Sequence, residues 1–460
     1  MKRDGSASDK HNAARAAVPP PLPPLATPVD EPIAGEHQTT PSSKISTLMT
    51  EVLHKENLKR ALERVKRNKG APGVDGMTVD ELGAHLKTHW PAIRAQLEDG
   101  TYQPKPVRRV EIPKPDGRKR LLGIPTVVDR FIQQALAQIV QRQWEPHFHP
   151  HSYGFRPGRN AHQAMRHAQA TIRQGYGWVV DIDLEAFFDT VNHDRLMVRV
   201  RSHVDAPDVL RLINRFLKGG VQVNGQTQAT IQGVPQGGPL SPMLANVVLD
   251  ELDWKLQTQG HRFARYADDC NIFVKSQRAG QRVMRNVTRY LSETLRLTVN
   301  ANKSAVDRPA NRKFLGFAVS KRGARIKVAD KAMEKLKHTI RTLTRRTRGH
   351  RLVDIVQELK TALNGWKAYF GIAEVLSPLR DIDKWVRRRL RCYVWKQWGS
   401  AGYRELRRRG VSVREAWNTS KSAHGPWRLS KTPALNAALP AKLFRQMGLP
   451  ELAPAKAKVA

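Results

Sequence analysis

The spacing of apolar positions predicts several helices and one hairpin in the first third of the chain. Apolar side chains over residues 50–69 fall on about one face of a helix, which Gly70 is expected to end. Alternating apolar residues over 107–125 flank Pro115-Asp116-Gly117 and predict a β-hairpin. Helical spacing returns over 126–144. These elements precede the part of the chain in which acidic residues cluster.

Two later apolar runs end at acidic residues. Residues 176–182 predict a short buried strand, and acidic residues continue from its end as far as Asp189. Residues 262–266 and 271–274 predict the arms of a second hairpin, with Ala267-Asp268-Asp269 between them. Both acidic sites therefore lie at strand ends, where a sheet can bring distant side chains together.

The two ends of the chain differ from this central part. Residues 1–46 are rich in Pro, Ala, Ser and Thr and cannot bury enough apolar surface to fold, which predicts a disordered tail. From about residue 329 onward the pattern is mostly helical, with dense arginine. Strands mixed with helices, followed by a basic helical segment, predict an α+β core with a helical appendage.

Charge narrows the class of partner. Lys and Arg number 79 against 41 Asp and Glu, a formal net charge of +38. Like charges repel across a compact fold, so an excess of this size indicates a polyanionic partner, with nucleic acid as the first candidate. We expect no membrane partner, because no long uncharged apolar run is present. The only two cysteines, Cys270 and Cys392, exclude a disulfide scaffold and favour buried thiols in a reducing compartment.

The acidic strand ends are candidates for a metal site. Adjacent carboxylates beside apolar strand residues repel each other, and a bound cation offsets that cost. Hard oxygen ligands favour Mg²⁺. Two such ions about 4 Å apart would support in-line phosphoryl transfer. Two unrelated solvated acidic turns remain the alternative for any single Asp-Asp pair.

A wider set of motifs, in consistent order and spacing, resembles a reverse transcriptase. More narrowly, it is similar to the reverse transcriptase and maturase encoded by bacterial group II introns, from about residue 47 onward. The motifs that carry this resemblance are Ser152–Pro157, Trp178–Asp189, Gly233–Pro242, Tyr266-Ala267-Asp268-Asp269, Phe314–Phe317 and Gly365–Gly371. The resemblance implies a right-hand polymerase, with fingers and palm built on antiparallel sheet, an α-helical thumb and a small basic C-terminal region.

The resemblance also assigns catalytic roles. Asp183, Asp268 and Asp269 match the family's metal ligands, with the Leu184 carbonyl as a further oxygen and two Mg²⁺ as cofactors. Lys303 matches the position proposed to protonate the leaving pyrophosphate, a general-acid role. Asp181 occupies a position that varies in the family and is expected to support the strand end.

Five residues are implied to bind the incoming dNTP. Lys114 and Arg120 match phosphate-binding residues of the fingertips, and Phe188 matches a steric gate that excludes the ribose 2′-hydroxyl. Gln236 and Gly237 lie beside the nucleotide in the implied arrangement. A surface turn with solvated lysines, a core aromatic and a plain Gly-Pro loop would look the same in isolation.

Basic side chains are expected to contact nucleic acid, chiefly in the thumb, where arginines alternate with aromatics. The predicted contacts are Arg156, Arg345, Arg346, Arg348, Lys367, Arg387, Arg388, Arg391 and Arg428. The aromatic residues that alternate with arginines in the thumb are expected to lie mostly in the hydrophobic core.

The implied domains are an N-terminal extension of the fingers (47–105), fingers and palm (106–322), thumb or maturase domain X (323–402) and a DNA-binding region (403–460) without an HNH endonuclease. The expected function is RNA-directed DNA polymerisation during retrohoming of a mobile intron, combined with maturase activity in RNA splicing. Expected partners are intron RNA, an RNA template with DNA primer, target DNA and dNTPs, in a cytoplasmic, nucleoid-associated ribonucleoprotein. The alternatives are an RNA-binding splicing cofactor with a vestigial polymerase, and a retron or diversity-generating reverse transcriptase.

Overall fold

The computed structural model describes residues 45–113, 117 and 119–453. Most of the predicted tail and Lys114 lie outside these ranges. A compact unit begins at Ile45. Within the described ranges, no helix is both long enough and apolar enough to cross a bilayer.

Three helices open the described chain: α1 (Thr47–Val52), α2 (Lys55–Asn68) and α3 (Leu82–Glu98). The single helix predicted over residues 50–69 is therefore wrong in one respect, because it is split at Leu53 and His54. The Asn57 amide donates hydrogen bonds to the carbonyls of Val52 and Ala135, at 2.9 and 3.0 Å. His54 caps the second helix by accepting from the Glu56 amide. Side-chain competition for backbone groups thus breaks a pattern that looks continuous.

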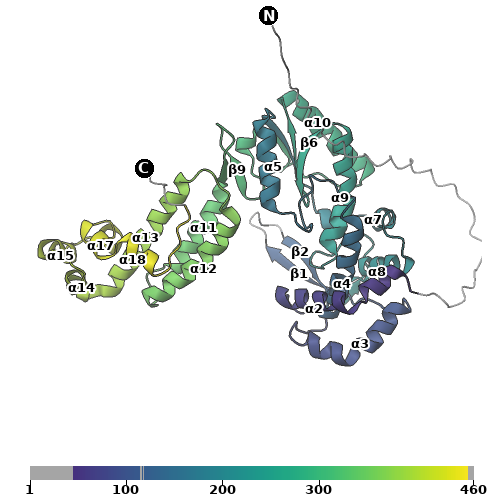
Figure 1. The fold of residues 1–460 in the computed structure, drawn as a ribbon, viewed down its shortest axis with the longest axis horizontal. Helices are drawn as coiled ribbons and strands as arrows, with labels where there is room; N and C mark the ends of the chain where they lie inside the picture. Colours follow the sequence, from purple (N-terminus) through teal and green to yellow (C-terminus); the bar gives the residue numbers. More distant parts are fainter. Residues whose placement is uncertain (1–44, 114–116, 118, 454–460) are drawn as a thin grey trace, which may run out of the picture. The chain divides into compact units, whose positions relative to one another are not determined.

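The fingers contain a four-stranded sheet in the order β2-β1-β4-β5. Its strands are β1 (Val107–Pro113), β2 (Lys119–Ile124), β4 (Val221–Val223) and β5 (Gln226–Gln228). The pairs β1–β2 and β4–β5 are antiparallel, and β1 and β4 are parallel. The hairpin predicted over 107–125 is confirmed, and so is the helix that follows it, α4 (Val127–Trp144). Figure 1 shows α2, α4 and this sheet in the same region.

The palm is a four-stranded antiparallel sheet in the order β6-β7-β3-β8. Its strands are β3 (Trp178–Ile182), β6 (Arg262–Tyr266), β7 (Asp269–Val274) and β8 (Ala305–Asp307). The helices associated with the palm are α5 (Ala161–Arg173), α6 (Phe187–Thr190), α7 (His193–Arg201), α8 (Pro207–Lys218), α9 (Ser241–Thr258) and α10 (Gln277–Arg289), which a π-helical turn extends to Thr294. The second predicted hairpin is confirmed, although its outgoing strand begins two residues earlier than expected, at Asp269.

The chain after the palm is mostly helical, as predicted. A short antiparallel pair, β9 (Phe317–Val319) and β10 (Ile326–Val328), precedes it. The helices are α11 (Asp330–Leu343), α12 (Leu352–Phe370), α13 (Ser377–Trp398), α14 (Gly402–Arg408), α15 (Val413–Ser420), α16 (Pro426–Leu429), α17 (Pro433–Ala438) and α18 (Ala441–Gln446), coloured green to yellow in Figure 1. They share one hydrophobic cluster, distinct from the one beneath fingers and palm. The α+β right-hand class with a helical thumb is confirmed.

Candidate active site

The sheet register brings the two acidic segments together. Strand β3 pairs with β7 so that Ile182 stands opposite Cys270, and Asp183 follows at the end of β3. Strand β6 pairs with β7 up to Tyr266 and Asp269, which leaves Ala267 and Asp268 as the turn. Residues 85 positions apart in the sequence (268 − 183) are thereby placed at one edge of the palm.

The electrostatics of the carboxylates reflect this proximity. Burial raises the pKa of Asp269 to about 6, and Asp268, Asp181 and Asp183 add to the rise. The pKa of Asp268 is also raised, first by burial, then by the charge of Asp183. Like charges in a partly desolvated place oppose ionisation, and a cation would relieve that opposition. The oxygen donors therefore suit a hard divalent cation.

The carboxylates are not arranged as a finished ligand set. Within the described ranges, no group of three or more His, Cys, Asp or Glu side chains is placed to hold a metal ion. The Lys303 ammonium lies 3.3 Å from Asp183 Oδ1 and partly neutralises it. A cation at Asp183 would compete with this lysine, which lies at the acidic site. The general-acid role of Lys303 stays a prediction.

Asp181 has a different partner. Both the Nε and an Nη of Arg312 donate to its Oδ2, at 2.9 and 2.7 Å. Arg312 thus binds the carboxylate of Asp181, the residue that we expect to support the strand end. A cleft of about 770 Å³ opens beside these side chains. Its lining includes three carboxylates and four lysines: Asp181, Asp183, Asp269, Lys303, Lys313, Lys327 and Lys331. The cleft has acids for cations and lysines for phosphates on its walls.

Backbone contacts fix the position of Asp183. Its amide donates to the Ser304 hydroxyl at 3.0 Å, and its carbonyl accepts from the Asn300 amide at 2.8 Å. Leu184 forms an isolated antiparallel bridge with Val299 and is buried. The segment that carries Lys303 is therefore joined to the strand end that carries Asp183, so the two side chains share one local framework.

The predicted nucleotide residues Phe188 and Gln236 belong to two segments in direct contact. The Val234 amide donates to the Phe188 carbonyl at 2.6 Å, and the Gly233 amide donates to the Val191 carbonyl at 2.7 Å. Gly233 has φ +91°, and a Cβ there would lie 3.1 Å from the Phe188 carbonyl oxygen. A side chain at position 233 would therefore separate the two segments.

Strand β2 of the fingers closes on the same loop. Arg120 Nε donates to the Gln236 side-chain oxygen at 2.8 Å, and the Gly123 amide donates to the Gln236 carbonyl at 2.9 Å. Gly237 has φ +131°, and a Cβ there would lie 2.7 Å from the Gly123 carbonyl oxygen. Arg120 also lowers the pKa of Asp268. Arg120, Gln236 and Gly237 are thus gathered beside the acidic turn, whereas Lys114 lies outside the described residues.

Arg156 is a correction. Its side chain is 3% exposed and forms an ion pair with Glu145 at 2.7 Å. It also donates to the carbonyls of His149 and Ser152. A guanidinium whose donors are used inside the protein has nothing left for a phosphate, so the predicted nucleic-acid contact is wrong in this structure. The sequence could not show this, because Glu145 lies 11 positions away on another element.

The predicted thumb contacts divide into two groups. Several have partners inside the protein: Arg348 forms a two-point ion pair with Glu358, Arg387 contacts Glu451, Lys367 donates to the Glu451 carbonyl, Arg391 donates to the Leu439 carbonyl, and Arg388 stacks on Trp427. Arg345, Arg346 and Arg428 are exposed. Arg345 and Arg346 also line a pocket of about 290 Å³ with Arg341, Arg389, Cys392 and Trp427.

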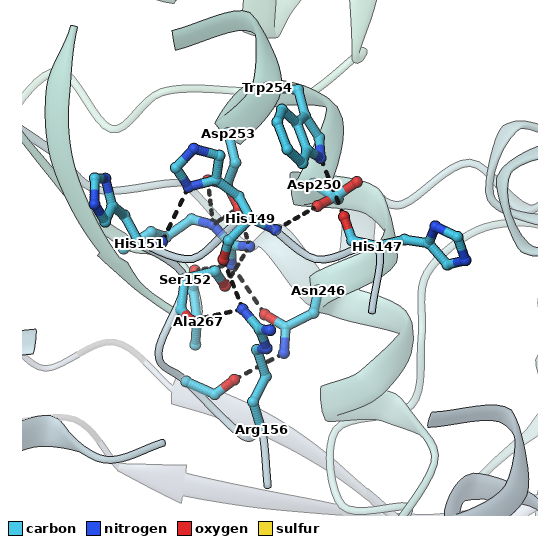
Figure 2. A network of polar contacts seen from close by, with 12 residues as sticks. His147, His149, His151, Ser152, Arg156, Asn246, Asp250, Asp253, Trp254 and Ala267 are labelled. Carbon is cyan, nitrogen blue, oxygen red and sulfur yellow. Dashed lines mark hydrogen bonds and ion pairs between the residues drawn. The ribbon is translucent and has the colours of Figure 1, made fainter. Parts of the chain in front are cut away.

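The sequence did not reveal a buried polar network behind the acidic turn (Figure 2). At its centre is Arg265, a strand residue with no exposed surface, ion-paired to the equally buried Asp253 on α9. Arg265 also contacts Asn246, Ser152 and the Ala267 carbonyl. One available signal was a charged residue between apolar neighbours in a predicted strand, because a buried charge requires a partner.

The comparisons with known proteins agree with this geometry. Residues 112–319 match the reverse transcriptase (RNA-dependent DNA polymerase) family, and residues 333–410 match the maturase-specific domain of group II introns. Protein YkfC of Escherichia coli (strain K12) is 34% identical over 308 residues, which are 58% of this chain and 81% of that protein. The maturase-specific match favours an intron protein over a retron or diversity-generating enzyme.

Two relatives are named as intron proteins. The group II intron-encoded protein LtrA of Lactococcus lactis subsp. cremoris is 39% identical over 197 residues, 42% of this chain and 32% of LtrA. A 91 kDa protein in the cob intron of Schizosaccharomyces pombe is 32% identical over 180 residues, 39% of this chain and 21% of that protein. The matches thus span a third or less of these two intron proteins. By its two domains and its relatives, the chain belongs to the group II intron reverse transcriptases, RNA-directed DNA polymerases that carry a maturase domain.

Proposed function

We propose that this chain copies intron RNA into cDNA at the acidic site of Asp183, Asp268 and Asp269 and binds the same RNA as a maturase. The observation that carries the polymerase site is the gathering of these carboxylates at one edge of the palm, where burial, followed by the charges of Asp268, Asp181 and Asp183, raises the pKa of Asp269 to about 6. The Arg120–Gln236 pair beside the turn supplies donors of the kind that a triphosphate requires.

Reverse transcriptase domains depend on divalent metal ions, and we assign these to two Mg²⁺. Asp183, Asp268 and Asp269 would hold them, with the Leu184 carbonyl as an added oxygen. When bound, the ions lower the pKa of the primer hydroxyl and neutralise the charge of the leaving pyrophosphate. The chain's own contribution is to fix the position of the carboxylates, as the backbone contacts of Asp183 with Ser304 and Asn300 show.

The remaining site residues orient the nucleotide. Arg120, together with Lys114, would bind the triphosphate, while Gln236 and the side-chain-free backbone at Gly237 would lie beside the sugar and base. The Phe188 ring would exclude a 2′-hydroxyl from below the sugar. Lys303, already 3.3 Å from Asp183, would give a proton to the pyrophosphate oxygen as it departs.

RNA is a partner of the polymerase and maturase domains, and we propose that it is intron RNA, bound in part through the thumb. The 290 Å³ pocket is lined by Arg341, Arg345, Arg346 and Arg389, and by no acidic side chain among the residues that the structure describes. Such a pocket attracts phosphates. The exposed Arg428 and the last helices would contribute contacts to target DNA, within a cytoplasmic, nucleoid-associated ribonucleoprotein.

The decisive experiment replaces Asp268 and Asp269 together with Ala and measures primer extension on an RNA template alongside RNA affinity. We expect cDNA synthesis to be abolished and RNA affinity to be unchanged, because the thumb is untouched. Retained synthesis would refute the metal assignment, because the polymerase would then work without these two carboxylates. The matched control is Asp307→Ala on β8, which removes a carboxylate from the same sheet without touching the turn.

A further inference from the structure

Arg265 uses its whole guanidinium inside the palm. Nε donates to Asp253 at 2.8 Å, Nη1 donates to Asn246 at 3.0 Å and to the Ala267 carbonyl at 2.9 Å, and Nη2 donates to Ser152 at 2.8 Å and again to Asp253. An arginine has five N–H donors, and all five are used here. The side chain therefore has one available arrangement. Figure 2 labels four of the residues that accept from it, Asp253, Asn246, Ser152 and Ala267.

The acceptor at Ala267 lies inside the acidic turn itself. Ala267 has φ +56°, a left-handed conformation that a residue with a side chain adopts only when its surroundings require it. Arg265 lies two residues before Ala267 and reaches forward to the carbonyl that this conformation presents. The hydrogen bond is charge-assisted and buried, which makes it strong enough to select one turn geometry.

The opposite side of the turn is closed by the segment that contains Ser152. The Tyr153 amide donates to the Arg265 carbonyl at 2.9 Å. A Cβ at Gly154 would lie 2.3 Å from the Ala267 nitrogen, so the backbone at Gly154 lies directly against the turn. Asn246 joins both sides, because its amide donates to the Gly154 carbonyl at 2.8 Å. The turn is thus fixed from the strand, from α9 and from this segment.

We propose that Arg265 is a positioning residue for polymerisation: its hydrogen bond to the Ala267 carbonyl keeps the turn left-handed and keeps Asp268 and Asp269 in place before the metal ions bind. The inference rests on the proposed role of the two carboxylates. Asp268 and Asp269 repel each other, so an unrestrained turn would relax to separate them. A prearranged turn spares the reaction that reorganisation.

Arg265→Lys provides the first test. An ammonium can keep the ion pair with Asp253 but cannot donate to Ala267, Asn246 and Ser152 at the same time. We expect kcat for primer extension to fall roughly 10- to 100-fold, because misplacement of reacting groups by about 1 Å has effects of that size. KM for dNTP should change little, since Arg120 and Gln236 belong to other segments.

The matched control is Arg156→Gln. Arg156 is also a buried arginine, is ion-paired to a carboxylate and contacts Ser152, but its hydrogen bonds go to Glu145, His149 and Ser152 rather than to the turn. Both substitutions should lower Tm, and only the Arg265 variant should lower kcat. If Arg265→Lys and Arg156→Gln lost the same amount of kcat for each degree of Tm that they lose, the proposal would be overturned. Arg265 would then act only through the general stability of the palm.

A double-mutant cycle separates positioning from stability. Glycine adopts positive φ without steric cost, so Ala267→Gly should make the turn less dependent on the hydrogen bond from Arg265. We expect Arg265→Lys to lower kcat several-fold less in the Ala267→Gly background than in the native one. Equal losses in both backgrounds would overturn the proposal.

The proposed metal site and the proposed role of Arg265 can be tested separately. If the Asp268→Ala, Asp269→Ala variant still makes cDNA, the proposed site itself is wrong. If that variant is inactive while Arg265→Lys keeps full kcat, only the positioning role is wrong. RNA affinity, measured for every variant, should stay at the native value, because the thumb is untouched, and the Tm of each variant shows whether it is folded.

Discussion

Arginines have different roles in the palm and in the thumb of this protein. In the palm, Arg265 is fully buried and gives every donor to neighbours, including the carboxylate of Asp253. In the thumb, Arg345 and Arg346 are exposed beside a pocket that, in the described part of the chain, no acidic side chain lines. The difference is an ion pair: the paired, buried Arg265 fixes geometry, whereas Arg345 donates to the Thr347 hydroxyl at 3.1 Å. An exposed arginine without an ion pair among the described residues leaves its charge for a polyanion.

The thumb itself contains both kinds. Arg348 is paired to Glu358 through two hydrogen bonds of 2.6 and 2.9 Å, only two residues beyond Arg346. A run of arginines in the sequence is therefore not a uniform binding surface. The contrast between palm and thumb predicts that substitutions in the palm change catalysis at constant RNA affinity, and that substitutions of unpaired thumb arginines do the reverse.

The largest effect should come from Asp183→Asn in the palm. Loss of this carboxylate removes a metal-binding charge, and we expect cDNA synthesis to fall by about 10³-fold or more, a loss of the size seen when transition-state charge stabilisation is removed. RNA affinity, measured by fluorescence anisotropy, should be unchanged. Asp181→Asn is the control, because Arg312 already occupies that carboxylate. Equal losses from both substitutions would remove the distinction between ligand and support.

Phe188→Ala should change which nucleotide is used. Without the ring, we expect the preference for dNTP over NTP, as a ratio of kcat/KM values, to fall roughly 10- to 100-fold, because the excluded group is a single hydroxyl. Phe187→Ala is the control, since that ring lies 5.2 Å from Phe188 but is buried in the core. It should lower Tm and leave the preference intact; a changed preference there would argue against a specific gate.

In the thumb, Arg345→Ala combined with Arg346→Ala should lower RNA affinity about tenfold at moderate salt. Each lost phosphate contact should also reduce the slope of log K against log salt by about one. The measurement is a series of Kd values between about 50 and 200 mM salt. Arg348→Ala should instead lower Tm and keep the slope, because its charge is used by Glu358. An unchanged slope in the double variant would contradict the binding role of the unpaired arginines.

The smallest expected effect concerns the repulsion within the acidic turn. A pKa of about 6 for Asp269 means that the folded protein binds this proton more tightly than the unfolded chain does. Stability is therefore lost as pH rises from about 4 through 6, and the loss is complete at pH 7. Asp269→Asn removes the charge and therefore avoids this loss of stability. It should raise Tm by roughly 2 °C at pH 7 without divalent ions and give no gain in Tm at pH 4. A gain that is constant with pH would show that repulsion is not its cause.

Local patterns were enough to predict much of this molecule. The hairpin over 107–125, the strand before Asp183 and the hairpin around Asp268 are each set by alternation of apolar residues within one short segment. The motif resemblance then pointed to the same carboxylates that the register of β3 and β7 brings together. Their catalytic roles stay predictions.

Features that depend on distant partners were missed. Arg265 is held by Asp253, Asn246 and Ser152, which lie 12, 19 and 113 positions away. The prediction that Arg156 contacts nucleic acid is wrong because its partly exposed partner, Glu145, cannot be seen in the pattern. The break between α1 and α2 depends on the amide of Asn57, which also reaches Ala135, 78 positions away. Charged and amide side chains reveal their role only through the fold.

The two cysteines have a practical consequence for experiments on this protein. Cys270 follows Asp269 on β7, and Cys392 lies on α13; both are buried. Burial raises the pKa of both thiols, so at neutral pH they stay protonated and react slowly with maleimides. A single cysteine introduced on the surface, for example at the exposed Ser400 after α13, would then be the preferred site of labelling. Fluorophores or crosslinkers could thus report on the thumb of a chain that keeps both natural thiols.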